Sequence, residues 1–251
     1  MSLSSLAVQM YTVREASVRD FRGALRQVAG LGYTAVELAG LYNLSPAEVR
    51  QTLNELGLTC VSGHLSLANL RENLDQEIET YLTLGASYLV CSSLPREERG
   101  NEVDFRRIAG ELNHIGQRCR AAGLGFCYHN HDFELVQFKG QYALDILLEN
   151  SDPANVQLEA DLYWLKFAGL EPAAYIRRWP GRMPLLHIKD MSATQPPTFA
   201  EVGAGILDWA GILAAAKEVG VKWYIVEQDT CPGDPFASIK VSLENYRKLA
   251  E

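Results

Sequence analysis

The sequence predicts an α/β fold, a closed (β/α)8 barrel of eight parallel strands that are each followed by a helix. Short apolar runs rich in β-forming residues alternate with longer amphipathic segments through the whole chain, which indicates repeated βαβ units. Eight such units fit into 251 residues, the usual size of this barrel. A doubly wound open sheet is the second interpretation, but Gln9 to Arg14 lacks its glycine-rich fingerprint. We expect one domain over residues 1–251, because no linker or change in composition divides the chain.

The first half of the chain contains four of the expected strands, at residues 6–11, 35–38, 59–64 and 88–91. Helices are expected at 20–31, 45–57, 69–84 and 104–122. The second helix has the clearest start, because Ser45 can cap it, Pro46 stands at its first position and Glu48 at its third. These helices run into glycines at 32, 57, 85 and 123, which are typical helix ends.

The fifth strand begins at Gly125, and its apolar part gives way within six residues to five polar ones, residues 129–132 and Glu134. Buried titratable groups are costly unless they pair or bind a metal, so this strand is expected to open into a polar site. A solvated loop with two incidental histidines is the alternative. The remaining strands are expected at 156–161, 185–189 and 223–227, and the remaining helices at 141–150, 172–179, 208–219 and 235–249.

Composition excludes several classes of partner. The net charge is −8 and the basic residues are dispersed, which argues against nucleic acid and anionic membranes. No apolar stretch of about 18 residues is present, and the first residues lack the basic region of a signal peptide. The five cysteines are scattered without a Cys-x-x-Cys pair, so they are expected to be buried thiols in a reducing cytoplasm.

Polar residues close every expected strand, and in a barrel the active site lies at these C-terminal ends. Four of the five histidines fall there, whereas His114 lies within an expected helix. Random placement would scatter them, so their distribution indicates a site. The strand-end residues are Gln9, Tyr11, Glu37, His64, residues 91–93, His129, His131, Glu159, Asp161, His187, Lys189, Glu227 and Gln228.

Alternation along the strands predicts a metal site. If the faces of Asp161, His187 and Glu227 point inward, these residues converge from three successive strands together with His129 or His131. Imidazole with carboxylate suits one ion of Zn²⁺, Mn²⁺, Co²⁺ or Fe²⁺, and suits Mg²⁺ less. Structural roles are the alternatives: Asp161 could cap a turn, His187 could be a satisfied core residue, and Glu227 could pair with Lys189.

Five segments carry a family resemblance: residues 128–134 (YHNHDFE), 159–164 (EADLYW), 186–191 (LHIKDM), 201–206 (EVGAGI) and 225–229 (IVEQD). Together with the first strand they resemble the sugar phosphate isomerase/epimerase family. This family belongs to the xylose isomerase-like barrel superfamily, with endonuclease IV-type repair enzymes and inosose dehydratases. The resemblance covers nearly the whole chain and implies one divalent metal held by His129, Asp161, His187 and Glu227. Many members carry Glu where this chain has His129, so its site would hold one negative charge fewer.

An enzyme acting on a sugar or keto sugar is the leading hypothesis. The metal would polarise a carbonyl while a neighbouring base removes the adjacent proton, giving isomerisation, epimerisation or elimination of water. Candidate acids and bases are Glu134, His131 and Glu159, with Lys189 as an acid or electrophile. Candidate substrate-binding residues are His64, Gln9, Tyr11, Glu37, Glu159 and Trp164.

Two other functions compete with this hypothesis. An abasic-site endonuclease should hold three metals with additional histidines, but strand four ends in Cys91-Ser-Ser and Trp164 stands where a histidine would be wanted. A non-catalytic sugar-binding barrel is the other, and it would bind keto sugars without turnover. The strand-end loops lack a cluster of basic residues, which favours an unphosphorylated substrate. The sequence is compatible with a monomer or a homo-oligomer.

Overall fold

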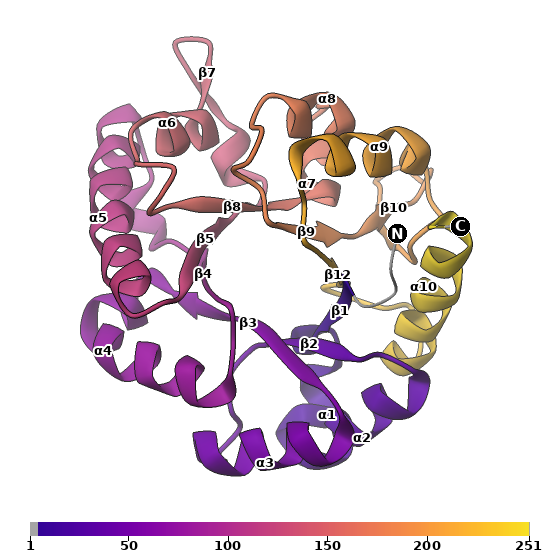
Figure 1. Ribbon diagram of the computed structural model, residues 1–251. Coiled ribbons are helices and arrows are strands. Elements are labelled where there is room, and N and C mark those ends of the chain that lie inside the picture. Colours follow the sequence, from indigo (N-terminus) through magenta and orange to yellow (C-terminus); the bar gives the residue numbers. More distant parts are fainter. Residues whose placement is uncertain (1–4, 251) are drawn as a thin grey trace.

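A computed structural model describes residues 5–250 and shows a closed barrel of eight parallel strands (Figure 1). Pairing of the first strand with the last closes the ring, with Val8 opposite Val226. The expected (β/α)8 barrel is therefore confirmed. The strands are β1 (Leu6–Gln9), β2 (Ala35–Leu38), β3 (Thr59–Ser66), β4 (Tyr88–Ser93), β5 (Gly125–His129), β8 (Gln157–Asp161), β9 (Leu185–Ile188) and β12 (Trp223–Val226).

Helices surround the strand ring, and local sequence signals set their ends. Ser45 and Glu48 form the expected capping box, in which each side chain accepts a hydrogen bond from the other residue's backbone N–H. Gly57 then ends that helix in a left-handed conformation, with a φ of 66°. The outer helices are α2 (Phe21–Leu31), α3 (Pro46–Leu56), α4 (Leu67–Leu84), α5 (Glu102–Ala121), α6 (Ala143–Glu149), α8 (Pro172–Arg177), α9 (Trp209–Val219) and α10 (Pro235–Leu249).

Several short elements near the C-terminal ends of the strands differ from the expectation. The first strand ends at Gln9, because its side chain accepts a hydrogen bond from the backbone N–H of Tyr11 and starts a 3-10 turn. The stretch 141–142 is a strand of a hairpin instead of a helix start, since Lys139 and Gly140 turn the chain with positive φ. The short elements are α1 (Arg14–Arg19), α7 (Leu162–Phe167), the 3-10 turns Met10–Val13, Arg96–Glu98 and Phe133–Leu135, and the hairpins β6 (Gln137–Phe138) with β7 (Gln141–Tyr142) and β10 (Asp190–Met191) with β11 (Phe199–Ala200).

The barrel interior has an apolar layer beneath a polar layer. Five strands place an apolar inward residue in the central cluster and a buried polar residue two positions later. Because alternate residues of a strand point to the same side, the polar layer lies directly on the C-terminal side of the apolar one. The pairs are Ala7 and Gln9, Ala35 and Glu37, Cys127 and His129, Leu185 and His187, and Ile225 and Glu227.

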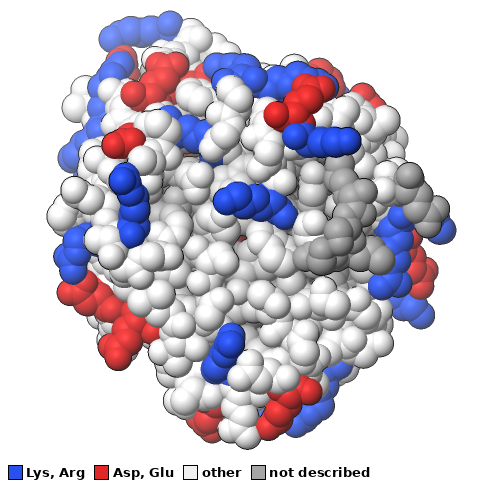
Figure 2. Space-filling model, viewed as in Figure 1, with Lys and Arg blue, Asp and Glu red and all other residues white. Residues whose placement is uncertain are grey.

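The strands follow one another clockwise in Figure 1, so with right-handed crossovers the view is onto the end where the strands begin. Figure 2 shows the same end, and its middle carries only a few separate basic side chains, with most charges near the margin. The polar layer therefore opens at the opposite end of the barrel. Within residues 5–250, no helix combines the length and apolarity that crossing a membrane requires.

Candidate functional site

The C-terminal ends of the strands surround a pocket of about 570 Å³. Histidines and carboxylates form its deep part, and neutral hydroxyl and amide groups form much of its wall. The expected site residues Tyr11, His64, His129, His131 and Glu227 all line it. The complete lining is Tyr11, Ala39, Gly40, His64, Leu65, Ser66, Asn69, Ser92, Ser93, His129, His131, Glu227 and Asp229.

The four candidate metal ligands, His129, Asp161, His187 and Glu227, come together at the bottom of this pocket. Each offers one ligand atom, and these atoms lie within 4.8 Å of one another. Nδ1 of His187 lies 2.9 Å from Oε2 of Glu227. Two imidazoles and two carboxylates are a donor set that suits Zn²⁺, Mn²⁺ or Co²⁺, so the residues present fit a divalent ion.

Asp161 serves the fold and the site at once. Its Oδ1 accepts hydrogen bonds from the backbone N–H groups of Tyr163 and Trp164 and so caps α7. Its Oδ2 is buried and receives no well-aligned hydrogen bond, although Nζ of Lys189 lies 2.9 Å away. A buried carboxylate oxygen without such a donor is costly, and a cation would relieve that cost.

His129, and not His131, lies beside the other candidate ligands. Nε2 of His129 is 3.8 Å from Oδ2 of Asp161. The ring of His131 instead stacks on Phe133, with ring centres 5.8 Å apart, and lies 6.0 Å from the Trp164 ring. Trp164 is not among the lining residues and packs behind His131, so its expected contact with substrate stays a prediction.

Glu37 forms the floor of the site. It accepts hydrogen bonds from the Gln9 side chain at 2.7 Å and from the Ser62 hydroxyl at 2.6 Å. Nε2 of His187 lies 2.7 Å away, and Nε2 of His64 lies 3.0 Å away. Burial alone would raise the pKa of Glu37, but the two histidines beside it hold that pKa well below its usual range.

Gln9, Glu37 and Glu159, whose expected contact with substrate stays a prediction, lie beneath the pocket. All three are fully buried, and none of them lines the pocket. Strand alternation correctly predicts that they point inward, but it does not predict how deep they lie. Glu159 lies between two histidines, 2.7 Å from Nε2 of His64 and 3.0 Å from Nδ1 of His129. Burial raises the pKa of Glu159 to about 7, and Glu37 contributes to this rise.

His64 connects these buried carboxylates to the pocket. Burial would lower the pKa of His64, but Glu37 and Glu159 raise it to about 10. His64 is therefore a cation at neutral pH and neutralises part of the acidic floor. The groups His64, His129, Glu159 and His187 also converge closely enough to hold an ion, but they share two members with the first set. These four residues are thus an alternative ion site that overlaps the first one.

Glu134, whose expected role as acid or base stays a prediction, is not among the residues that line the pocket. It accepts hydrogen bonds from the hydroxyl of Tyr128 and, at 2.8 Å, from the backbone N–H of His131. It is fully buried, and burial raises its pKa to about 7. These hydrogen bonds hold the turn that carries His129 and His131.

Lys189 lies among three carboxylates. Its Nζ is 2.9 Å from Asp161, 2.6 Å from Glu227 and 2.9 Å from Asp229. Burial alone would lower the pKa of Lys189, but these carboxylates hold it well above its usual value. Asp229 is a pocket residue that was not predicted, although its position two residues after Glu227, in the loop that follows β12, was the available signal.

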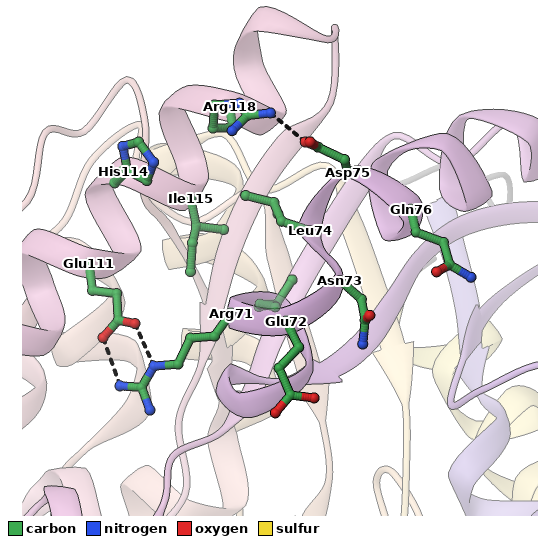
Figure 3. A pocket seen from close by; sticks show the side chains of 11 residues that line it. Arg71, Glu72, Asn73, Leu74, Asp75, Gln76, Glu111, His114, Ile115 and Arg118 are labelled. Atoms are coloured by element: carbon green, nitrogen blue, oxygen red, sulfur yellow. Dashed lines mark hydrogen bonds and ion pairs between the residues drawn. The ribbon is translucent and has the colours of Figure 1, made fainter.

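A second hollow, of about 550 Å³, lies outside the barrel between α4 and α5 (Figure 3). Its charged side chains pair with one another: Arg71 contacts Glu98 and Glu111, and Arg118 contacts Asp75. Its described lining residues form no converging group of the kind that could hold a metal ion, so the candidate site remains the pocket at the strand ends.

Comparison with known proteins agrees with the family resemblance expected from the sequence. A family model described as "Xylose isomerase-like TIM barrel" matches residues 25–249. An inosose dehydratase from Geobacillus kaustophilus is 24% identical, over 90% of this chain and 86% of that protein. A solved sugar phosphate isomerase/epimerase from Parabacteroides distasonis superposes with a TM-score of 0.84 at 25% identity, covering 97% of this chain and 93% of the other. A solved IolI protein, described with a bound zinc atom, shares the fold at 17% identity and a TM-score of 0.77, over 98% and 97% of the two chains.

Proposed function

Because this chain belongs to the xylose isomerase-like TIM barrel family, we propose that it is a divalent-metal-dependent sugar isomerase or epimerase. It would remove a proton next to the carbonyl of an unphosphorylated sugar or keto sugar. The observation that carries this proposal is the convergence of His129, Asp161, His187 and Glu227, with ligand atoms within 4.8 Å of one another at the bottom of a polar pocket. Such a cluster is costly to bury unless it serves binding or catalysis.

One divalent ion, Mn²⁺, Zn²⁺ or Co²⁺, would be held by these four residues. When bound, it supplies a Lewis acid that polarises a carbonyl and orients neighbouring oxygens. The buried Oδ2 of Asp161 and the facing pair of His187 and Glu227 support this assignment, as does the zinc described for the IolI protein.

His131 is the residue that we assign as the base. It lines the pocket, and its buried Nδ1 has no hydrogen-bond partner. Burial, helped by the charge of Lys189, lowers the pKa of His131 to about 3, so its imidazole is neutral at pH 7. Lys189 lies deeper and provides positive charge near the oxygen on which negative charge develops.

The pocket lining suits a neutral polyhydroxylated substrate. It contains the carboxylates Glu227 and Asp229, whereas none of its described residues is Lys or Arg. The guanidinium of Arg14, which contacts the pocket residues Tyr11 and Asp229, donates to their backbone carbonyls. The hydroxyl and amide groups of residues 66, 69, 92 and 93 can bond sugar hydroxyls, while a phosphate dianion would meet repulsion.

Dehydration of a keto sugar or cyclitol is a second candidate. The observation that favours it is the match to inosose dehydratases over most of both chains. Both reactions begin with the same proton removal, and they differ in whether a hydroxyl group then leaves. The pocket geometry is compatible with either outcome.

The test is to incubate the metal-loaded protein in D2O with unphosphorylated ketoses and inososes. We expect one substrate carbon to exchange hydrogen for deuterium, with an isomer or epimer as product. A product that has lost one water would instead establish the dehydratase. Sugar binding without exchange or turnover would show that the protein is a non-catalytic sugar-binding barrel. Cleavage of abasic-site DNA would show that it is a nuclease. Either result overturns the proposal.

A further inference from the structure

Lys189 occupies the same carboxylate oxygens that the proposed metal would need. Its Nζ lies 2.9 Å from Oδ2 of Asp161 and 2.6 Å from Oε2 of Glu227. Both residues belong to the converging group of ligands, and Oε2 of Glu227 is also the oxygen 2.9 Å from Nδ1 of His187. The lysine side chain is itself buried, with 1% of its surface exposed. An ammonium and a divalent ion therefore share two of four ligands.

We infer that Lys189 is a built-in cation that competes with the divalent metal for Asp161 and Glu227. Two buried carboxylates facing each other are unfavourable without a cation between them, and Lys189 supplies that charge. The same positive charge repels a divalent ion at a distance of a few ångströms, where Coulomb interactions in a protein are strong. Lys189 thus holds the ligand pair in place and at the same time weakens its affinity for metal. This inference rests on the metal site of the proposed function.

Asp229 offers the ammonium of Lys189 another carboxylate partner. Its Oδ2 lies 2.9 Å from Nζ, its side chain is 28% exposed, and it lines the pocket. The backbone carbonyl of Asp229 accepts a hydrogen bond from Arg14 at 2.9 Å, which fixes the loop that carries it. When a metal takes Asp161 and Glu227, the ammonium keeps Asp229 and moves toward the pocket, where a substrate oxygen would bind.

The decisive variant is Lys189→Met, which keeps the length of the side chain and removes its charge. We expect its metal-free form to melt at a lower temperature than the wild type, and its apparent Kd for Zn²⁺ in chelator competition to fall by about tenfold or more. The rise in Tm on adding Zn²⁺ should therefore be larger in the variant than in the wild type. A Kd that is unchanged or weaker would overturn the inference.

The matched control is Lys166→Met, which removes a lysine paired with Glu171 on the outer side of α7. It should leave both the Tm and the Kd at wild-type values. If the control shows the same tightening, general charge and not the position of Lys189 is responsible, and the inference fails.

A measurement on the wild type covers the case in which Lys189→Met does not fold. The ¹⁵N-labelled ammonium signal of Lys189 should shift on titration with Zn²⁺, because the group loses two carboxylate contacts; an unmoved signal contradicts the inference. The outcomes also separate the two proposals. A wild type that binds no divalent ion overturns the proposed function, whereas one-to-one binding with no tightening in the variant overturns this inference alone.

Discussion

Nε2 of His187 on β9 lies 2.7 Å from Oε1 of Glu37 on β2, although 150 positions separate them in the chain. This contact crosses the barrel beneath the pocket. It leaves the other ring nitrogen of His187, Nδ1, facing Glu227 at 2.9 Å. A carboxylate on the outer nitrogen of a metal-binding histidine fixes its orientation and raises its basicity. Glu37 is therefore placed to orient His187 for a metal.

Glu37→Gln tests this arrangement. We expect the affinity for Zn²⁺ to fall by about 10- to 100-fold, the usual effect of losing such an outer partner. Chelator competition on the metal-free protein measures it. Ser62→Ala is the control, since it removes a neighbouring hydrogen bond to Glu37 at 2.6 Å but leaves the contact with His187. Equal affinity of the Glu37 variant and the wild type would refute the role.

The ligand set itself predicts metal content. Purified wild-type protein should contain about one equivalent of a divalent ion, as a four-ligand site implies. His187→Ala and Asp161→Ala should lose it while the barrel stays folded by circular dichroism. His114→Ala, on α5, is the control and should retain the ion. Full retention of metal by both ligand variants would show that the ion binds elsewhere.

The buried carboxyl of Glu134 predicts a pH-dependent stability. Burial raises its pKa from 4.5 to about 7, so between these pH values the folded state holds a proton that the unfolded chain has lost. Wild-type stability should therefore fall as pH rises through this window. Relative to Glu134→Gln, the loss should be about 3 kcal/mol between pH ~5 and pH ~8.

Denaturant unfolding of both proteins at the two pH values measures this difference. Asp132→Asn, which removes a neighbouring exposed carboxylate, serves as the control and should parallel the wild type. We also expect Glu134→Gln to retain the metal, because Glu134 contacts none of the four ligand side chains in the described structure. Parallel pH profiles for wild type and Glu134→Gln would refute the prediction.

The composition of the pocket wall predicts which substrates are preferred. A sugar should be turned over with higher kcat/KM than its phosphate ester, because Glu227 and Asp229 face the pocket, no Lys or Arg is among its described lining residues, and the cationic His64 is already paired with Glu37 and Glu159. Paired steady-state kinetics on one sugar with and without phosphate measures this. A preference of tenfold or more for the ester, about 1.4 kcal/mol of transition-state binding, would overturn it.

The sequence was sufficient to predict the barrel because apolar runs, capping residues and glycines mark each strand and outer helix independently. It also predicted the ligand group, since residues that close adjacent strands must meet. It could not choose between His129 and His131 from the residues alone, because both share a strand face. The structure distinguishes the two histidines because the ring of His131 packs against Phe133 and Trp164.

The depth at which inward-facing side chains lie and the positions of the short helices could not be predicted, for physical reasons. Gln9 and Glu37 follow the same alternation as Glu227, yet only Glu227 reaches the pocket, because strand register sets height and no local pattern encodes it. The six-residue helices α1 and α7 are too short to show a helical repeat of apolar residues. Asp161 caps α7, so one side chain both begins that helix and faces the site.

Closure of the ring by β1 against β12 has a consequence for when the ion can be acquired. Glu37, His64 and His129 are synthesised before Glu227, which directly follows β12. A nascent polypeptide that lacks β12 carries most of the donors but not the enclosure that gathers them. If the proposed metal site is correct, loading would therefore follow closure of the barrel, and a chain that stalls or misfolds before closure would not hold an ion in this geometry.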